Sequence, residues 1–203
     1  MLDARRLAHG QAAGLAAWGL QPPLRVVALA QLPAAAALAP RLAAGWMALG
    51  LSCATVAGAP PLWDDAPAAD VWLWRADPDV LARWWPRNTG APLVPLLAQP
   101  PALVAAYRAL KTLRLQGASP AVLALARAPG EAAALQAALV ALGRTCAQHL
   151  GWRPAAWTLG YHHERHTQQE ADADTTVLTR ALEAAWLLDT DAPAEARRPS
   201  ATC

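Results

Sequence analysis

Residues 25–50, RVVALAQLPAAAALAPRLAAGWMALG, decide the fold of this chain. The apolar run at 24–30 is typical of a buried strand, and the alanine-rich segment that follows Pro33 is typical of a helix. Pro40 is expected to break or kink that helix, so we expect it to run best over 41–49 and to end at Gly50. Many nucleotide-binding domains begin with such a strand, turn and helix. The turn here nevertheless contains no glycine and no lysine.

The rest of the chain repeats this alternation. Further strands are predicted at 52–57, 70–74, 91–97, 120–128 and 155–161, and helices at 77–85, 101–116, 131–151 and 175–188. The strand at 52–57 is expected to be buried, and the one at 91–97 to be an edge or poorly formed strand because it contains two prolines. Alternating strands and helices predict an α/β fold, with a mostly parallel twisted sheet flanked by helices on both faces.

The 203 residues are enough for one such domain. We assign the domain to 24–188, an N-terminal amphipathic arm to 1–23, and a disordered acidic tail to 189–203. The three cysteines form no CxxC pair, which favours a reducing compartment, and the N-terminus lacks the pattern of a signal peptide. A cytoplasmic location is therefore expected.

Two classes of partner receive little support from composition. The uncharged run at 42–63 is about as long as a membrane span of roughly 20 residues, but its glycines and the Pro60–Pro61 pair favour a helix end followed by a strand. The formal net charge of +2 by itself indicates neither nucleic acid nor a strongly acidic partner.

The motifs of nucleotide hydrolysis are missing. A phosphate-binding loop needs glycines, a lysine and a serine or threonine, and the chain's single lysine, Lys111, falls in a predicted helix far from such a turn. No acidic residue lies near residues 57–59, at the end of the second predicted strand, where a carboxylate for Mg²⁺ would stand. We therefore assign no catalytic residue, no nucleotide-binding residue and no cofactor.

One segment could hold a metal ion. The stretch YHHERHTQQE, 161–170, places His162 and His166 four residues apart, with His163 and Glu164 between them. Two histidines at that spacing share a helix face and can bind zinc, but no third ligand is evident. A solvated polar loop after a strand is the favoured interpretation. A metal-dependent enzyme built on this cluster stays open as an alternative.

Several stretches together resemble the MinD/ParA-type deviant-Walker ATPases, and among them the flagellar-number regulators FlhG and FleN. These regulators carry a D-Q-A-x-x-L-R helix before their first strand, and GQAAGLA at 10–16 keeps Gln11, Ala12 and Leu15 at that spacing. Their D-A-Y-x-x-I-K helix is matched by AAYRALK at 105–111, and 122–166 is similar to the strand and helix that follow. The Asp and Arg of the first motif are replaced by Gly10 and Ala16.

The resemblance implies a P-loop NTPase-like topology without the P-loop, and a non-catalytic regulator of flagellar number or placement. Family members engage the signal-recognition-type GTPase FlhF through the N-terminal helix. The partner-binding residues that follow are Gln11 for polar contact, with Leu15 and Trp18 as apolar anchors. A merely amphipathic arm and a residual ATP-binding MinD-like protein are the alternatives.

The resemblance also raises the question of membrane binding, because active relatives use a C-terminal amphipathic helix for it. The predicted helix at 175–188 contains Arg180 as its only basic residue, and Asp189 and Asp191 follow. Attraction to anionic lipid is therefore expected to be weak or absent.

Overall fold

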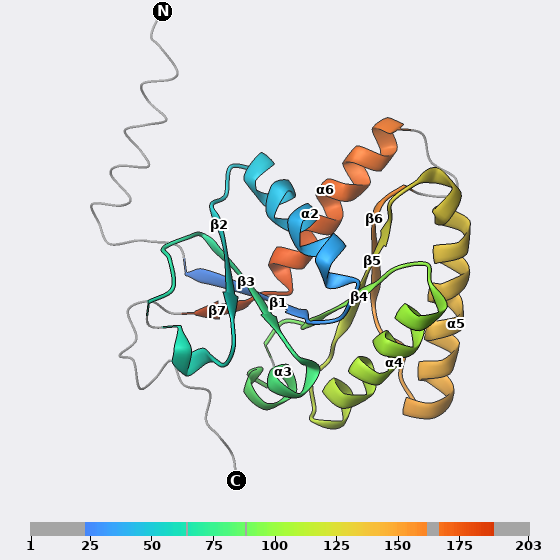
Figure 1. The fold of residues 1–203 in the computed structure, drawn as a ribbon, viewed down its shortest axis with the longest axis horizontal. Coiled ribbons are helices and arrows are strands. Elements are labelled where there is room, and N and C mark those ends of the chain that lie inside the picture. Colours follow the sequence, from blue (N-terminus) through green and yellow to red (C-terminus); the bar gives the residue numbers. More distant parts are fainter. Residues whose placement is uncertain (1–22, 64, 88, 162–166, 189–203) are drawn as a thin grey trace, which may run out of the picture.

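The computed structural model describes residues 23–63, 65–87, 89–161 and 167–188 (Figure 1). Seven strands join into one sheet with the order β2-β3-β1-β4-β5-β6, and β7 pairs with β1. The elements are β1 Leu24–Ala30, α2 Ala35–Ala48, β2 Cys53–Ala57, β3 Val71–Ala76, α3 Pro78–Trp84, β4 Leu93–Leu96, α4 Pro100–Leu115, β5 Ala121–Ala126, α5 Ala132–Leu150, β6 Ala156–Gly160, α6 Thr167–Glu183 and β7 Trp186–Leu188, with short 3-10 turns at Pro60–Leu62 and Pro129–Glu131.

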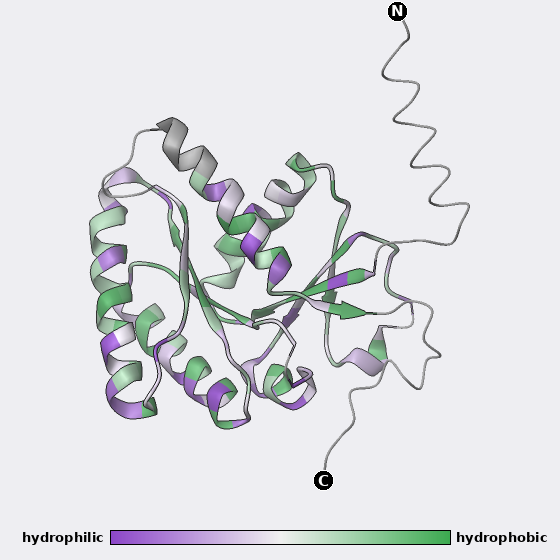
Figure 2. Ribbon diagram, turned by 180° about the vertical axis from the view of Figure 1, so that it is seen from behind, coloured by the Kyte–Doolittle hydropathy of each residue, from purple (hydrophilic) through white to green (hydrophobic). Residues whose placement is uncertain are grey.

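The predicted α/β class is confirmed, because β1 to β6 pair in parallel and helices cover both faces of the sheet. Along β1, Val26 and Ala28 join the core cluster of α3, α4 and α5, whereas Val27 and Leu29 join the cluster of α2 and α6. Figure 2 shows the hydrophobic strands between helices that carry hydrophilic residues as well. The arrangement is consistent with a Rossmann- or P-loop-like topology. Among the described residues, no helix is long and apolar enough to cross a membrane.

The expectation that Pro40 breaks the first helix is wrong, since α2 runs unbroken from Ala35. Pro40 and the preceding-turn residue Ala36 are both exposed, so the carbonyl that lacks an N–H partner can bond to water instead. The buried side chain of Trp46 also ties α2 to α6, because its indole N–H donates to Leu178 O at 3.2 Å. The predicted end is confirmed: the helix stops before Gly50, whose φ is +82°.

Of the two alternatives for 91–97, an edge strand is wrong, because β4 lies between β1 and β5 and is buried along its whole length. The strand is nevertheless short, Leu93–Leu96, and pairs with β1 at one position only. Ala121 N–H donates to Pro92 O at 3.0 Å. The backbone polar groups of successive strand residues point alternately to the two neighbouring strands. Because the carbonyl of Pro92 points to β5, the backbone groups of Pro95, three residues on, point to β1. β1 ends at Ala30, so the missing N–H of Pro95 removes no bond from the sheet.

Two further expectations need correction. The second strand, β2, is an outer strand of the sheet in which only Val56 is buried. The last helix, predicted at 175–188, differs at both ends: α6 begins at Thr167, so 167–170 is helix and not the polar loop expected there, and it ends at Glu183. Trp186–Leu188 then forms β7, antiparallel to β1. Burial explains the C-terminal end, because Trp186 and Leu188 reach the core only if the chain leaves the helix.

A cluster of five tryptophans fills the core beside β7. Trp63 packs edge-on against Trp74 with ring centroids 5.0 Å apart, and Trp74 stacks with Trp85 at 6.3 Å. Trp72 and Trp186 complete the cluster. Such pairs stabilise a fold beyond the area they bury. The chain lacks phenylalanine, so tryptophan supplies these large core volumes.

Candidate functional site

The carboxyl ends of β1, β3, β4 and β5 meet at one edge of the sheet, where open α/β folds bind their ligands. The chain reverses its direction of winding at β1, since β2 and β3 lie on one side of it and β4 to β6 on the other. The turn between β1 and α2 therefore occupies the position at which a phosphate-binding loop would stand in a nucleotide-binding relative.

The backbone N–H groups of this turn donate hydrogen bonds to carbonyl oxygens of the protein itself. Leu32, Ala35 and Ala37 each donate to a carbonyl oxygen of the same turn, at 2.8, 2.8 and 3.2 Å. Gln31 N–H donates to Ala76 O in β3 at 2.8 Å. A phosphate cradle requires such N–H groups to point at the ligand. In this turn the N–H groups of Gln31, Leu32 and residues 35–37 are occupied by protein oxygens.

Two basic side chains at the same edge are held by neighbouring residues. Arg75 Nε donates to Gln31 Oε1 at 3.1 Å. Arg127, which follows β5, forms a salt bridge with Glu131 at 2.7 Å, and its backbone N–H donates to the same carboxylate at 2.9 Å. Hydrogen bonds from the Arg127 side chain lower the pKa of Glu131. Both partners are thus kept charged and directed at each other.

Neither cysteine in the described ranges is activated as a nucleophile. Cys146 is fully buried and Cys53 is partly buried, and burial raises the pKa of both thiols. Nucleophilic cysteines need the opposite shift, which a neighbouring cation or a helix N-terminus provides.

The residues singled out in the sequence lie outside the described ranges. Gln11, Leu15 and Trp18 belong to 1–22, and the cluster from His162 to His166 belongs to 162–166. The arm and the metal cluster therefore both stay predictions. Across the parts of the chain that are described, no group of three or more His, Cys, Asp or Glu side chains could hold a metal ion.

The structure does fix the strand end that precedes the histidine segment. Tyr161 N–H donates to Ala126 O at 3.2 Å, and the Asp174 carboxylate in α6 accepts the Gly160 N–H at 2.8 Å. Gly160 itself has a φ of +82° and its Cα lies against Ala126 O, where a Cβ would be only 2.2 Å away. The segment thus starts from a rigidly held strand end at the carboxyl edge.

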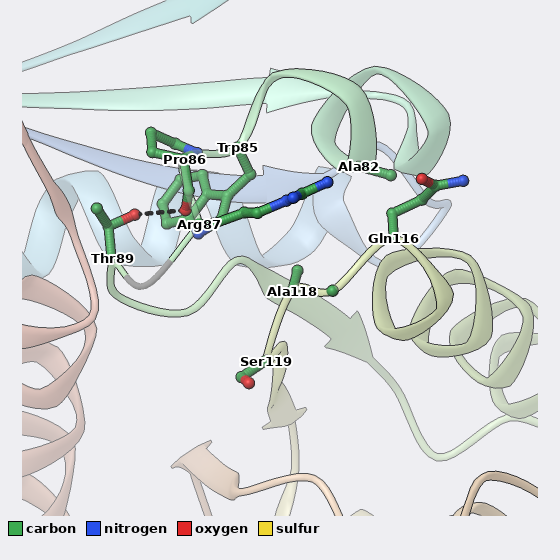
Figure 3. Close-up of a pocket in the computed structure, with 9 residues that line it drawn as sticks. Ala82, Trp85, Pro86, Arg87, Thr89, Gln116, Ala118 and Ser119 are labelled. Atoms are coloured by element: carbon green, nitrogen blue, oxygen red, sulfur yellow. Dashed lines mark hydrogen bonds between the residues drawn. The ribbon is translucent and has the colours of Figure 1, made fainter. Parts of the chain in front are cut away.

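A cavity of about 70 Å³ lies at the opposite edge, between the ends of α3 and α4 (Figure 3). Trp85 forms one wall, and its buried Nε1 has no hydrogen-bond partner among the described residues. Arg87 and Thr89 line it from one side and Gln116 and Ser119 from the other. A polar space of this size can hold water, which is the usual partner of such a nitrogen. No pattern in the sequence indicated this cavity.

Comparison with known proteins adds no assignment: no family model matches this chain, and no curated protein is significantly similar to it.

Proposed function

We propose that this chain is a non-catalytic, MinD/FlhG-like regulator of flagellar number or placement that acts through protein contacts, with an FlhF-like GTPase as its partner. The β1–α2 turn carries this proposal. It joins the strand and helix that flank a phosphate-binding loop in nucleotide-binding proteins, yet its N–H groups bond to protein oxygens. A chain that keeps the surrounding topology without the cradle is suited to binding other proteins rather than to turning over a nucleotide.

The partner contact is assigned to the N-terminal arm. Gln11 supplies a side-chain amide for hydrogen bonding, and Leu15 and Trp18 supply apolar anchors one to two helical turns away. These three positions come from the resemblance to the activation helix of the flagellar regulators. A cytoplasmic location is part of the proposal, because such regulators act on cytoplasmic GTPases.

Calorimetry with Mg·ATP tests the non-catalytic part. We expect no measurable heat of binding and no phosphate release above background, because the turn offers no free cradle. An active MinD-type ATPase measured in parallel is the positive control for both the heat of binding and the release of phosphate. Tight ATP binding with hydrolysis would overturn this part of the proposal.

A binding titration tests the partner contact. The purified chain is titrated against an FlhF-like GTPase, first unchanged and then with Gln11→Ala and Leu15→Ala combined. We expect the double variant to weaken the complex by about tenfold or more, since loss of two interface anchors costs at least 1.4 kcal/mol. Gln21→Ala, beyond the motif, is the matched control and should bind like the unchanged chain. Equal binding by all three proteins contradicts the assignment of the arm.

A further inference from the structure

Charge is distributed unevenly between the two faces of the molecule. Residues 80–163 contain eight of the 17 lysines and arginines but only one of the 15 acidic residues, Glu131. This stretch supplies α4 and α5, neither of which contains an acidic residue, and together with α3, whose first turn carries Asp79, they cover one face of the sheet. The net charge of +2 for the whole chain conceals this concentration, because the remaining residues are acidic overall.

All but one of these cations form no salt bridge within the described ranges. Glu131 is already paired with Arg127, and none of the other seven basic residues of 80–163 forms a salt bridge with a described residue. Arg114 lies over the ring of Trp152 at 5.3 Å, and Arg83 lies over Trp84 at 5.7 Å. Uncompensated charges of one sign create a potential that attracts an oppositely charged partner.

The same face exposes aliphatic side chains among its cations. On α4, Val104, Arg108, Lys111 and Leu115 are all exposed at spacings of four, three and four residues, so they lie along one stripe. Val104 is 51% and Leu115 70% exposed.

The adjacent helix α5 continues this surface. Ala133, Ala137 and Ala141 are exposed together with Val140 and Arg144, and α4 and α5 contact each other along the same face. Small side chains let another helix approach closely. We call the eight residues Val104, Arg108, Lys111, Leu115, Ala137, Val140, Ala141 and Arg144 the α4–α5 surface.

We propose that the α4–α5 surface is a docking site for an acidic amphipathic helix of a partner protein. Acidic side chains of that helix pair with Arg108, Lys111 and Arg144, while its apolar side chains cover Val140 and the flanking alanines. This surface lies on helices separate from the N-terminal arm. It therefore goes beyond the regulator function proposed above and does not depend on it.

The chemistry of the surface favours a protein over the other polyanions. Sequence-independent binding of single-stranded nucleic acid relies on exposed aromatic rings for base stacking. Trp84 and Trp152 are half-buried here and lie beneath arginines. A duplex is held through its phosphates by basic side chains and would leave the exposed Val104, Leu115 and Val140 uncovered. A lipid surface is held by a continuous band of bulky apolar side chains that reach the acyl region. Here the exposed bulky apolar residues Val104, Leu115 and Val140 are separated by charged residues and alanines.

A designed peptide of about 18 residues, with glutamates on one helical face and leucines on the other, serves as the probe. Its binding to the full chain is followed by fluorescence anisotropy at low and at physiological salt. A matched peptide carries lysine in place of each glutamate. We expect the acidic peptide to bind and the lysine peptide not to bind, with affinity falling as salt rises.

Variants locate the site. Combined Arg108→Glu, Lys111→Glu and Arg144→Glu should weaken binding of the acidic peptide by about tenfold or more. Arg41→Glu, an exposed arginine of α2 on the opposite face, is the matched control and should change binding by less than about twofold. If the triple reversal does not fold by circular dichroism, the corresponding glutamine substitutions provide the same comparison.

Val140→Ser separates docking from plain charge attraction, since it should weaken binding severalfold without altering charge. Unchanged binding by the charge variants or by Val140→Ser would overturn the proposal. Vesicles of phosphatidylglycerol and a short DNA duplex are titrated in the same way. Tighter binding of either, lost in the triple reversal, would assign the surface to lipid or to nucleic acid and would likewise overturn it.

Discussion

At the scale of single residues, Gly90 marks a close approach between two segments of the backbone. A Cβ at this position would lie 1.8 Å from Ala184 O, and the next residue, Ala91, donates its N–H to that same oxygen at 2.8 Å. No side chain can move aside here, because the obstacle is backbone. We predict that Gly90→Ala lowers the free energy of unfolding by about 2–4 kcal/mol in urea titrations.

A second glycine provides the control. Gly143 lies within α5 and a Cβ there would meet nothing within 4 Å, so Gly143→Ala should raise stability by about 0.5–1 kcal/mol through helix propensity. Opposite signs for the two substitutions are the expected result. If Gly90→Ala unfolds at the same urea concentration as the unchanged protein, the close contact between Gly90, which precedes β4, and Ala184, which follows α6, is wrong.

Asp70 links stability to pH at the start of β3. The Ser52 hydroxyl donates to its carboxylate at 2.5 Å and the Ser52 N–H at 2.7 Å, and these bonds hold the pKa of Asp70 below its ordinary value of 3.8. Because the folded-state pKa is lowered, its contribution to stability is complete above about pH 4 and is lost as pH falls through the folded pKa.

We therefore predict that Asp70→Asn destabilises the protein at neutral pH, and that the difference from the unchanged protein shrinks as the pH is lowered toward 3. Urea titrations at a series of pH values measure this difference. Asp65→Asn, an exposed aspartate without such bonds in the described ranges, should give a profile parallel to that of the unchanged protein. A constant difference between Asp70→Asn and the unchanged protein at every pH contradicts the linkage.

At the scale of elements, β7 forms where the sequence predicts helix, and it adds Trp186 to the tryptophan cluster of the core. Its three residues pair with β1, and Trp186 contacts both Trp63 and Trp85 of the tryptophan cluster. We predict that Trp186→Ala costs about 3–5 kcal/mol of stability, as large-to-small core substitutions do. Leu187→Ala on the same strand should cost only about 0.5 kcal/mol, because Leu187 is 54% exposed. Similar losses for both would mean that β7 does not dock as described.

The elements that the sequence predicts well are those determined by local pattern. β5 is a run of six buried apolar residues, and α5 is an uninterrupted alanine-rich helix closed by Gly151, so local propensity and tertiary burial agree. The failures all depend on what lies nearby in space. Pro40 is tolerated because it faces solvent, Pro95 because β1 ends beside it, and Trp186 leaves the helix because a core cluster receives it.

The candidate sites also include features that the sequence shows and features that depend on the folded structure. The absence of glycine and lysine after β1 is visible in the sequence, but the hydrogen bonds that occupy the turn depend on its folded geometry. The cavity beside Trp85 joins residues of two loops some 30 positions apart, which no local pattern connects. The net charge of +2 for the whole chain gives no sign of the α4–α5 surface. The excess of basic residues is evident only within the helices that cover one face of the sheet, and the sequence alone does not show which helices these are.

At the scale of the whole molecule, the sheet has a seam between β1 and β4, which pair at a single position, Leu29 with Leu93. The strands on either side of the seam pair over four to six positions. Helices α2 and α6 compensate, because one core cluster joins them to Leu73 and Leu29 on one side and to Leu93 and Leu123 on the other. The two halves of the sheet thus share one apolar core.

We predict that this shared core makes unfolding a single cooperative transition. The tryptophan cluster lies on the β2-β3-β1 side of the seam, so tryptophan fluorescence weights that half, whereas far-UV circular dichroism follows helices on both sides. Urea midpoints from the two probes should coincide. Leu29→Ala should lower the free energy of unfolding by about 3 kcal/mol, because its side chain is fully buried at the seam. Both urea midpoints should fall by the same amount. Fluorescence that changes at lower urea than circular dichroism would show that the halves unfold separately, and that α2 and α6 do not couple them.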